Sequence, residues 1–283
     1  MAPRVKVTIP YLREKKAEGK PITMLTAYDF PIASIEEEIG IDIILCGDSL
    51  GMTVYGFSGT NPVTMDLMIP HAAAVKRAAP NSFVLGDMPF MSYQASNERA
   101  VLNAGRFIQE GGVDGVKLEG GEEMAERIQA ISRAGIPVMG HIGLTPQSVS
   151  ALGGFKAQGR SAAGALKLIR DAGLLEEAGA FGILLEAIPS EIGEIITRLA
   201  GIPIIGIGAG PHTDGQVLVV HDALGFFGGH KAKFVKQYAD VNGVIRKALL
   251  EYRKDVETGG YPAAEHGYGI DPAVLAEVKS KLM

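Results

Sequence analysis

The chain has 283 residues, of which 47% are hydrophobic and 21% charged, proportions typical of a folded globular protein and not of a disordered one. Its 27 Lys and Arg against 32 Asp and Glu give a net charge of −5, which argues against nucleic acid or an anionic membrane as the main partner. A single cysteine excludes an intrachain disulfide framework, and no apolar run approaches the ~20 residues that span a bilayer or resembles a signal peptide, so we expect a cytoplasmic protein.

Short apolar runs recur along the chain, and each ends in glycine or a carboxylate. The runs do not alternate with polar residues, which is typical of strands buried on both faces of a parallel sheet. In chain order they read ITMLTAYD, IDIILCGDS, SFVLGDMP, DGVKLEG, IPVMGHIGL, FGILLEAIP, IPIIGIGAG and GQVLVVHDAL.

Helix-like segments separate most of these runs, for example at 97–110, 122–134, 162–177 and 192–200. Eight strands with intervening helices predict an α/β fold, a (β/α)8 barrel, with residues 1–283 forming a single domain. We also expect an N-terminal helix at 9–18 that closes the barrel bottom, and a C-terminal helical tail. A doubly wound open sheet is the alternative.

The connections between the runs are uneven in length. The gap at 210–215 is too short for a helix, whereas the gaps at 51–81 and 144–182 are long enough for substrate loops or subunit contacts. The second long gap contains the Gly-rich, basic stretch SALGGFKAQGR at 150–160. This stretch could be a lid, an anion clamp or a solvated loop.

Five carboxylates stand where five of the predicted strands end. In a barrel, side chains at the carboxyl ends of the strands form the active site. Alternation along each strand places a carboxylate on the face of the residue two positions before it, as Asp48 follows Cys46. If that earlier residue points into the barrel, the carboxylate does too. The five residues are Asp29, Asp48, Asp87, Glu119 and Glu186.

Carboxylates gathered in a low-dielectric barrel mouth need a neutralising charge. An oxygen-only ligand set suits Mg²⁺, whereas Zn²⁺ would favour His or Cys, and the six His form no ligand pattern. Lys117, two residues before Glu119, adds a second positive charge. The two oxygens of a 2-oxo acid would chelate the metal, which would polarise the ketone and stabilise an enolate.

Each candidate also has a structural interpretation. Asp29 could cap the following helix, and Lys117 could be only a structural ion-pair partner. Glu186, apolar on both sides, is either a desolvated general base or a buried partner of a helix cap. His141 could contact a ligand or be a satisfied core histidine, and Cys46 is expected to be inert core.

Eight motifs follow one another in an order that closely resembles the ketopantoate hydroxymethyltransferase family, from about Tyr11 to Lys254. The resemblance implies a (β/α)8 barrel of the phosphoenolpyruvate/pyruvate superfamily and a role in pantothenate and coenzyme A biosynthesis. It also implies a homo-oligomer, since members of the family are typically decamers. The motifs are TAYD, CGDSLGM, GDMPFMSY, DGVKLEGG, GHIGLTPQ, GGFKAQGR, ILLEAIP and IPIIGIGAG.

The resemblance assigns ligands to the strand-end residues. It implies Mg²⁺ at Asp48, Asp87 and Glu119. The 2-oxo acid would be bound through that metal, through the Asp48–Ser49 pair, and through Lys117.

The resemblance also implies a catalytic base and a co-substrate. Glu186 would remove the C3 proton of 3-methyl-2-oxobutanoate, and 5,10-methylenetetrahydrofolate would supply the one-carbon unit. The products would be 2-dehydropantoate and tetrahydrofolate. Tyr28, in TAYD, and His141, in GHIGLTPQ, are further candidate contacts.

Three other functions compete with this interpretation. A metal-dependent C–C lyase or phosphonomutase acting on another 2-oxo acid would have the same barrel and metal site. A Schiff-base aldolase would use Lys117 as its nucleophile. A catalytically inactive scaffold barrel is disfavoured, because burying this carboxylate set without a metal or substrate serves no purpose in folding.

Overall fold

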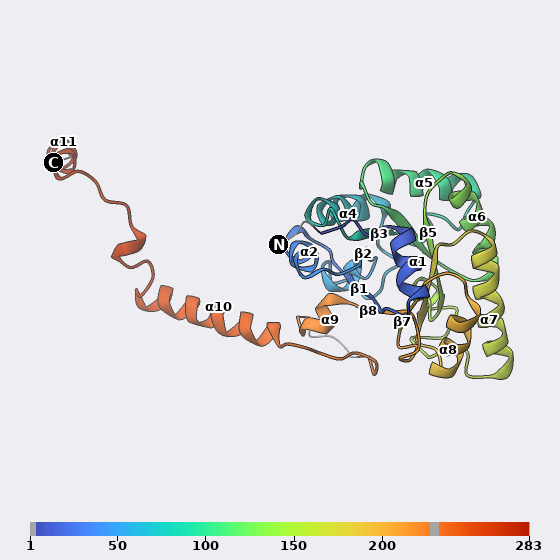
Figure 1. Cartoon of the computed structure of the whole chain (residues 1–283). Coiled ribbons are helices and arrows are strands. Elements are labelled where there is room, and N and C mark those ends of the chain that lie inside the picture. Colours follow the sequence, from blue (N-terminus) through green and yellow to red (C-terminus); the bar gives the residue numbers. More distant parts are fainter. Residues whose placement is uncertain (1–3, 227–231, 283) are drawn as a thin grey trace.

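The computed structural model describes residues 4–226 and 232–282. Within them, eight parallel strands close into a barrel in chain order, and β1 completes the ring by pairing with β8 (Figure 1). This closure confirms the predicted (β/α)8 barrel and excludes an open sheet. The strands are β1 (Ile22–Thr26), β2 (Ile43–Cys46), β3 (Phe83–Asp87), β4 (Gly115–Glu119), β5 (Val138–Gly143), β6 (Gly182–Glu186), β7 (Ile204–Ile207) and β8 (Gly215–Leu218).

Helices follow most of the strands and cover the outside of the barrel (Figure 1). The predicted helix at 162–177 is confirmed without a shift, and a fourteen-residue helix occupies half of the long 51–81 gap. The helices are α1 (Ile9–Ala17), α2 (Phe30–Ile39), α3 (Leu50–Thr53), α4 (Met65–Ala78), α5 (Asn97–Gln109), α6 (Ala125–Arg133), α7 (Ala162–Glu177), α8 (Ser190–Leu199), α9 (Val220–Leu224), α10 (Val241–Thr258) and α11 (Pro272–Leu282), with 3-10 turns η1 (Glu122–Met124), η2 (Pro146–Ser148) and η3 (Ala264–His266). None of these helices is long and apolar enough to cross a membrane.

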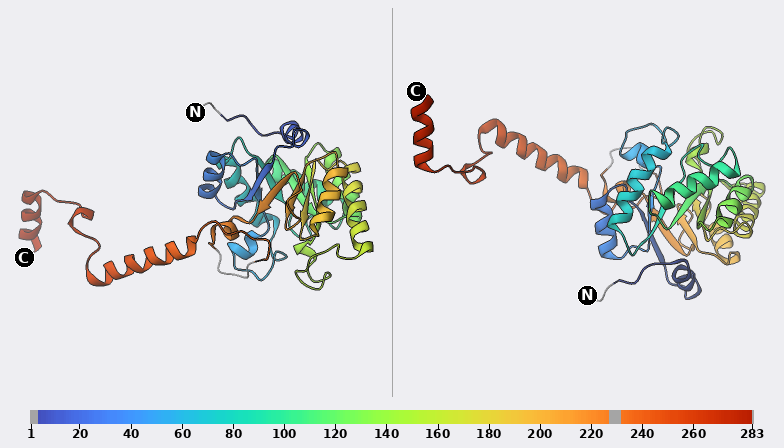
Figure 2. Two further views of the ribbon diagram at one scale, coloured as in Figure 1. Left: turned by 60° about the horizontal axis from the view of Figure 1, so that its bottom comes forward. Right: turned by 90° about the horizontal axis from the view of Figure 1, so that it is seen from above.

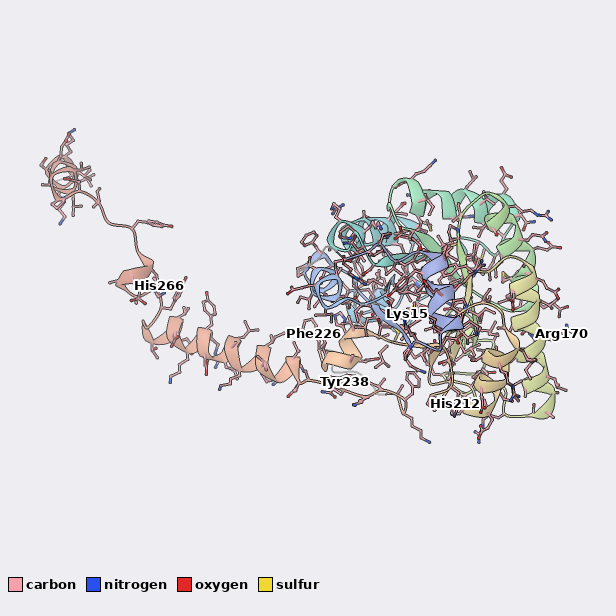
Figure 3. The ribbon with its side chains drawn as sticks, in the orientation of Figure 1. Lys15, Arg170, His212, Phe226, Tyr238 and His266 are labelled. Atoms are coloured by element: carbon pink, nitrogen blue, oxygen red, sulfur yellow. The ribbon has the colours of Figure 1, made fainter. Side chains whose placement is uncertain are left out.

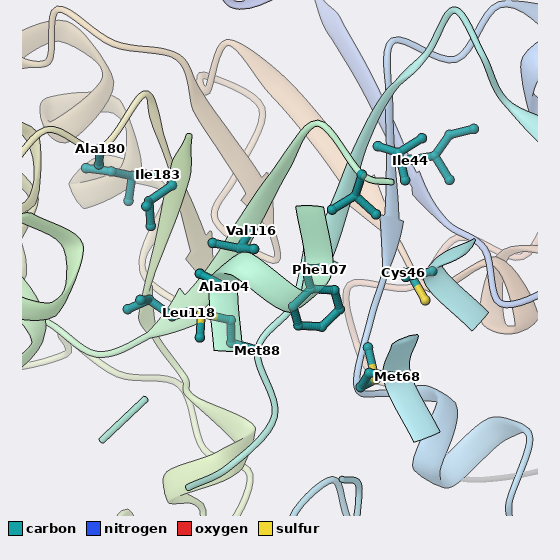
Figure 4. Packing of buried hydrophobic residues seen from close by; sticks show 14 of the residues in the cluster. Ile44, Cys46, Met68, Met88, Ala104, Phe107, Val116, Leu118, Ala180 and Ile183 are labelled. Atoms are coloured by element: carbon teal, nitrogen blue, oxygen red, sulfur yellow. The ribbon is translucent and has the colours of Figure 1, made fainter. Parts of the chain in front are cut away.

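Strand side chains alternate between the barrel interior and the layer beneath the helices. Leu85 and Leu184 lie in the interior cluster, as the alternation predicts. The condition that the earlier residue points inward is not met at Cys46, because its side chain packs in the outer cluster, under the helices (Figure 4). Strand β2 ends at Cys46 and the chain turns at Gly47, so strict alternation stops before Asp48.

The helix layer approaches the barrel closely at Phe107 of α5. This ring is fully buried and lies among the residues shown in Figure 4. A Cβ atom at Gly86 of β3 would lie 2.3 Å from Cδ1 of Phe107, a separation that no side chain tolerates. Glycine at this position therefore lets α5 pack directly on the strand whose next residue is Asp87.

The N-terminal helix α1 closes the barrel bottom, as predicted. Leu12 is fully buried in the interior cluster. Lys15 Nζ lies 2.7 Å from Asp42 Oδ2, and Lys16 Nζ lies 2.7 Å from Asp214 Oδ2 (Lys15 is labelled in Figure 3). Each aspartate also accepts a backbone N–H from a neighbouring strand, so the lysines bind side chains that already hold strands together.

One part of the barrel wall has no covering helix of its own. The chain passes from β7 to β8 without a helix, as the short 210–215 gap predicts. A groove of about 900 Å³ lies here instead, lined by residues of β1 and β8, by Gly208 and Gly210 after β7, and by Phe234 and Tyr238. Beyond it, α10 and α11 extend away from the barrel, and neither helix has a buried residue (Figures 1 and 2).

Helix α2 contains a buried carboxyl group without a partner. Glu36 is 3% exposed, and within the described residues neither of its side-chain oxygens has a hydrogen-bond partner. Burial, with a smaller effect of Asp29, raises the pKa of Glu36 to about 8. The folded state therefore favours the protonated carboxyl of Glu36. The contribution of Glu36 to the free energy of unfolding is greatest below the ordinary pKa of a glutamate and is lost as the pH rises through about 8.

Replacing Glu36 should remove this pH dependence. We expect Glu36→Gln to unfold at a higher temperature than the wild type at about pH 9, with the difference shrinking towards about pH 5, because glutamine never ionises. Calorimetry across this range measures the effect, and the exposed Glu38→Gln on the same helix is the control. An equal difference at both ends of the range would contradict the assignment.

Candidate active site

The strand ends of β2, β3 and β4 bring three buried carboxylates to one place. Asp48 follows β2, while Asp87 and Glu119 are the last residues of β3 and β4. They are 4%, 2% and 5% exposed. Asp29, the other strand-end carboxylate of the first half, accepts the backbone N–H of Ile32 and caps α2, so its structural interpretation is the one observed.

Lys117 lies among these carboxylates and is itself buried. Its Nζ is 2.8 Å from Asp87 Oδ1 and 3.9 Å from Glu119 Oε1. Asp87 also accepts the backbone N–H of Asp48 at 2.9 Å through Oδ2. One lysine and one backbone amide thus orient both oxygens of Asp87.

His141 connects this cluster to Glu186. Its Nδ1 lies 3.5 Å from Glu119 Oε1 and 3.3 Å from Lys117 Nζ, and its Nε2 lies 3.2 Å from Glu186 Oε2. His141 is 2% exposed, so it is not a solvated surface residue. Because it touches a strand-end carboxylate on either side, its position fits a site residue better than a core histidine satisfied by the backbone.

Close packing of β5 against β6 fixes the backbone beside Glu186. Gly143 has φ +98°, and a Cβ there would lie 2.2 Å from the Glu186 carbonyl oxygen. That oxygen accepts the backbone N–H of Leu144. The next residue, Ala187, has φ +49°, a left-handed conformation rare for a residue with a side chain, and its carbonyl accepts the N–H of Gln158. The backbone on both sides of Glu186 is therefore constrained.

The Gly-rich stretch at 150–160 lies beside the mouth, because its Gln158 bonds to the residue after Glu186. Phe155 within it is 59% exposed. The contact places the stretch next to the site, and the choice between lid, anion clamp and solvated loop stays a hypothesis.

Tyr28 and Ser49 form a hydroxyl chain near the cluster. The Tyr28 hydroxyl lies 2.8 Å from Ser49 Oγ and accepts a hydrogen bond from Thr26 Oγ1 at 2.9 Å. Burial raises the pKa of Tyr28, so the phenol stays protonated and can donate. Ser49 directly follows Asp48, which brings this chain to the edge of the carboxylate cluster.

Sequence reasoning missed two buried residues that complete the cluster, Gln147 and Tyr93. The side chain of Gln147 donates to Asp48 Oδ2 at 2.9 Å, and its backbone N–H donates to Glu119 Oε2 at 3.0 Å. The hydroxyl of Tyr93 lies 2.7 Å from Gln147 Oε1. Both residues fall inside the motifs quoted above, in GHIGLTPQ and GDMPFMSY, but neither carries a charge or a strand-end position that would have singled it out.

The charges of the cluster strongly perturb one another. Burial raises the pKa of Asp48 well above its usual range, and Asp87 and Glu119 raise it further. Burial alone would lower the pKa of Lys117, but the three surrounding carboxylates raise it overall. Lys117 is therefore protonated, which argues against the Schiff-base aldolase, since the nucleophile would have to be a neutral amine.

His141 and Glu119 stabilise each other in their charged forms. Burial and Lys117 would lower the pKa of His141, yet hydrogen bonds to Glu119 and Glu186 raise it to about 9. Burial likewise opposes ionisation of Glu119, but His141 and Lys117 lower its pKa. The histidine thus faces Glu186 as a cation near neutral pH.

The donor chemistry of the cluster suits a hard cation. Asp48, Asp87 and Glu119 offer only oxygen, and burial together with the two neighbouring carboxylates raises the pKa of Asp48, so its ionised form is incompletely compensated by Lys117. In the described ranges, no three His, Cys, Asp or Glu side chains are arranged as a ready metal-binding group. An oxygen of Asp87 instead contacts Lys117, and an oxygen of Asp48 accepts from Gln147.

Solved structures share the fold of this chain. A phosphonopyruvate hydrolase in complex with oxalate and Mg²⁺ matches with a TM-score of 0.61 at 13% identity, covering 97% of this chain and 96% of the other. A 2,3-dimethylmalate lyase, described as a PEP mutase/isocitrate lyase superfamily member, matches with a TM-score of 0.60 at 16% identity, covering 99% and 96%. The protein therefore has the closed α/β barrel fold of these enzymes, and the likeness concerns the fold alone.

Sequence comparisons identify the family within that class. Residues 6–264 match the family described as ketopantoate hydroxymethyltransferase. Two relatives named 3-methyl-2-oxobutanoate hydroxymethyltransferase, from Moorella thermoacetica and Clostridium beijerinckii, are each 53% identical, covering 95% and 97% of this chain and 100% of each relative. The chain belongs to the ketopantoate hydroxymethyltransferase family, whose members are transferases, and the predicted family resemblance is confirmed. The roles assigned to individual site residues stay predictions.

Two substitutions should change the stability of the metal-free protein in opposite directions. Asp48→Asn should raise the unfolding temperature, because it removes one of three repelling carboxylates while keeping an acceptor for Gln147. Lys117→Met should lower stability by about 3–5 kcal/mol, since it leaves buried carboxylates without their partner. Thermal and urea unfolding with chelator present measures both, and a destabilising Asp48→Asn would contradict the inferred excess of negative charge.

Proposed function

We propose that this chain transfers a hydroxymethyl group from 5,10-methylenetetrahydrofolate to 3-methyl-2-oxobutanoate, giving 2-dehydropantoate and tetrahydrofolate. The names of the family and of its relatives support this reaction. The observation that carries it is the contact of Glu186 with His141, beside a buried cluster of three carboxylates and a lysine. A base next to a site for a 2-oxo acid is what removal of the C3 proton requires. The reaction would serve pantothenate synthesis in the cytoplasm.

The 2-oxo acid would bind in front of the carboxylate cluster. Asp48, Asp87 and Glu119 would hold Mg²⁺, which when bound supplies positive charge to polarise the keto group. The Ser49 hydroxyl is placed by Tyr28 at the edge of this cluster and can donate to the substrate carboxylate. These contacts orient the substrate before proton removal.

Glu186 would take the proton from C3, and the substrate would become an enolate. The protonated Lys117 can stabilise the negative charge that develops on the keto oxygen. His141, whose Nε2 lies 3.2 Å from Glu186 Oε2, keeps that carboxylate oriented towards the substrate until it accepts the proton. Carbon C3 would then bond to the methylene carbon of the folate, both C–N bonds of that methylene bridge would break, and water would supply the hydroxyl oxygen. The proton taken from C3 and one proton of the water would go to the two nitrogens of the released tetrahydrofolate.

Proton exchange tests the first half of this reaction. NMR in D₂O would follow loss of the C3 proton of 3-methyl-2-oxobutanoate with and without Mg²⁺ and with and without tetrahydrofolate. We expect Mg²⁺-dependent exchange, and we expect Glu186→Gln to slow turnover by roughly 10²–10⁴-fold, the usual contribution of a general base. The exposed Glu191→Gln, on helix α8 after the same strand, is the matched control.

The outcomes separate the remaining alternatives. Near-wild-type turnover by Glu186→Gln would remove it as the base. Exchange without transfer from methylenetetrahydrofolate would favour a lyase or mutase acting on another 2-oxo acid. A folded wild-type protein that shows neither exchange nor transfer would overturn the proposed substrate.

We further propose that the chain forms a homo-oligomer, a decamer by family resemblance, through its projecting tail. Helix α10 carries apolar residues at helical spacing, among them Ile245, Leu249, Tyr252 and Val256, and all of them are exposed. The groove beside β1 and β8 is lined mostly by apolar residues. An exposed apolar helix face and an apolar groove on one chain suit reciprocal contacts between copies. No nucleic acid or membrane partner is proposed.

Removing residues 241–283 should therefore reduce the oligomer. Light scattering coupled to size-exclusion chromatography is expected to give a smaller assembly for the truncated chain. A milder variant, Leu249→Glu with Tyr252→Glu, should have the same effect without shortening the chain, since charges would have to be buried in the groove. The exposed Lys254→Glu on the same helix is the control. An unchanged assembly in both variants would rule the tail out.

A further inference from the structure

Gln147 has a complete set of hydrogen bonds in the interior of the site. It lies in η2, between β5 and α7, and is 3% exposed. Its side-chain nitrogen donates to Asp48 Oδ2 and to the Met88 carbonyl, both at 2.9 Å. Its side-chain oxygen accepts from the Tyr93 hydroxyl at 2.7 Å and from Gln94 Nε2 at 3.2 Å. Two donors and two acceptor sites are thus used, as many as an amide offers.

These partners fix the orientation of the amide. The Met88 carbonyl can only accept, so the nitrogen must face it, and the same nitrogen then donates to Asp48 Oδ2. A flipped amide would set its oxygen against both of these oxygens and its nitrogen against the nitrogen of Gln94. The amide therefore has one stable orientation, and the Asp48 carboxylate is held in turn.

Gln147 also reaches the second carboxylate through its backbone. Its N–H donates to Glu119 Oε2 at 3.0 Å, while the Tyr93 hydroxyl, bonded to the same glutamine, accepts the backbone N–H of Glu119 at 3.0 Å. Asp48 follows β2 and Glu119 ends β4, so the two acids come from strands that are not neighbours. A single residue from a third element joins them.

A neutral donor has a particular value at this point. Lys117 already contacts Asp87, and another cation on Asp48 would neutralise the charge that attracts a metal ion. An amide donates a hydrogen bond without adding net charge. It restrains two mutually repelling carboxylates, one oxygen of each, and leaves their negative charge in place.

We propose that Gln147 is a positioning residue that holds Asp48 and Glu119 in register for a divalent cation. The inference rests on the proposed function in one respect, that the carboxylate cluster receives such a cation. It does not depend on which 2-oxo acid or one-carbon donor the enzyme uses.

The test is the affinity of the protein for Mn²⁺ alone, measured by electron paramagnetic resonance titration of free Mn²⁺ without substrate. Gln147→Met keeps the length of the side chain and removes its hydrogen bonds. We expect it to raise the dissociation constant by about 10–100-fold, the usual effect of losing a group that orients metal ligands. Gln109→Met, the same change at an exposed helix position, should leave the constant unchanged.

A second variant covers the case in which Gln147→Met does not fold. Tyr93→Phe removes the hydroxyl that binds Gln147 Oε1 and the backbone N–H of Glu119, and should weaken Mn²⁺ binding in the same direction by a smaller factor. In either variant, an affinity within twofold of the wild type, together with a lowered unfolding temperature, would show a purely structural role and overturn the proposal. A wild type that binds no Mn²⁺ would overturn it too.

The proton-exchange assay keeps this inference separate from the proposed reaction. Weakened Mn²⁺ binding by Gln147→Met, in a protein whose wild type exchanges no C3 proton, would support the positioning role and refute the substrate. Normal exchange by the wild type, with an unchanged Mn²⁺ affinity in the variant, would support the substrate and refute the positioning role.

Discussion

The site is organised by negative charge buried at the ends of three neighbouring strands. Burial and mutual repulsion make the ionised form of Asp48 unfavourable, so the surroundings must supply compensation. Lys117 gives a full positive charge, His141 gives a second one shared with Glu186, and Gln147 gives a hydrogen bond without charge. The arrangement costs folding free energy, and the same unfavourable negative charge is what can attract a cation.

Much of the barrel could be predicted from the sequence, because parallel strands buried on both faces leave an unmistakable pattern of continuous apolar runs. The carboxylates at their ends could be found for the same reason, since strand ends meet at one edge. Alternation failed at Cys46, where a glycine turn ends the strand early and breaks the period of two. Asp29 showed the other weakness, because a strand-end acid and a helix cap look identical in sequence.

Sequence patterns of this kind could not predict the hydrogen bonds of Gln147 and Tyr93 in the site. Their partners are more than 25 residues away in sequence, for example 99 residues between Gln147 and Asp48. A buried amide or phenol on an irregular loop has neither the periodicity nor the charge by which a sequence pattern could identify it. Only the closure of the barrel, which brings the loops after β3 and β5 together over β4, creates these contacts.

The lysine contacts at the barrel bottom have a consequence for the order of folding. Lys16 belongs to the first helix, yet its partner Asp214 lies 198 residues further along, just before the last strand. The helix made first can therefore take its final place only after nearly the whole barrel has been assembled. Contacts of such long sequence separation form slowly, because much chain entropy is lost before they can form. Docking of α1 should thus be among the last events of folding. It would indicate that the eight-stranded barrel has closed.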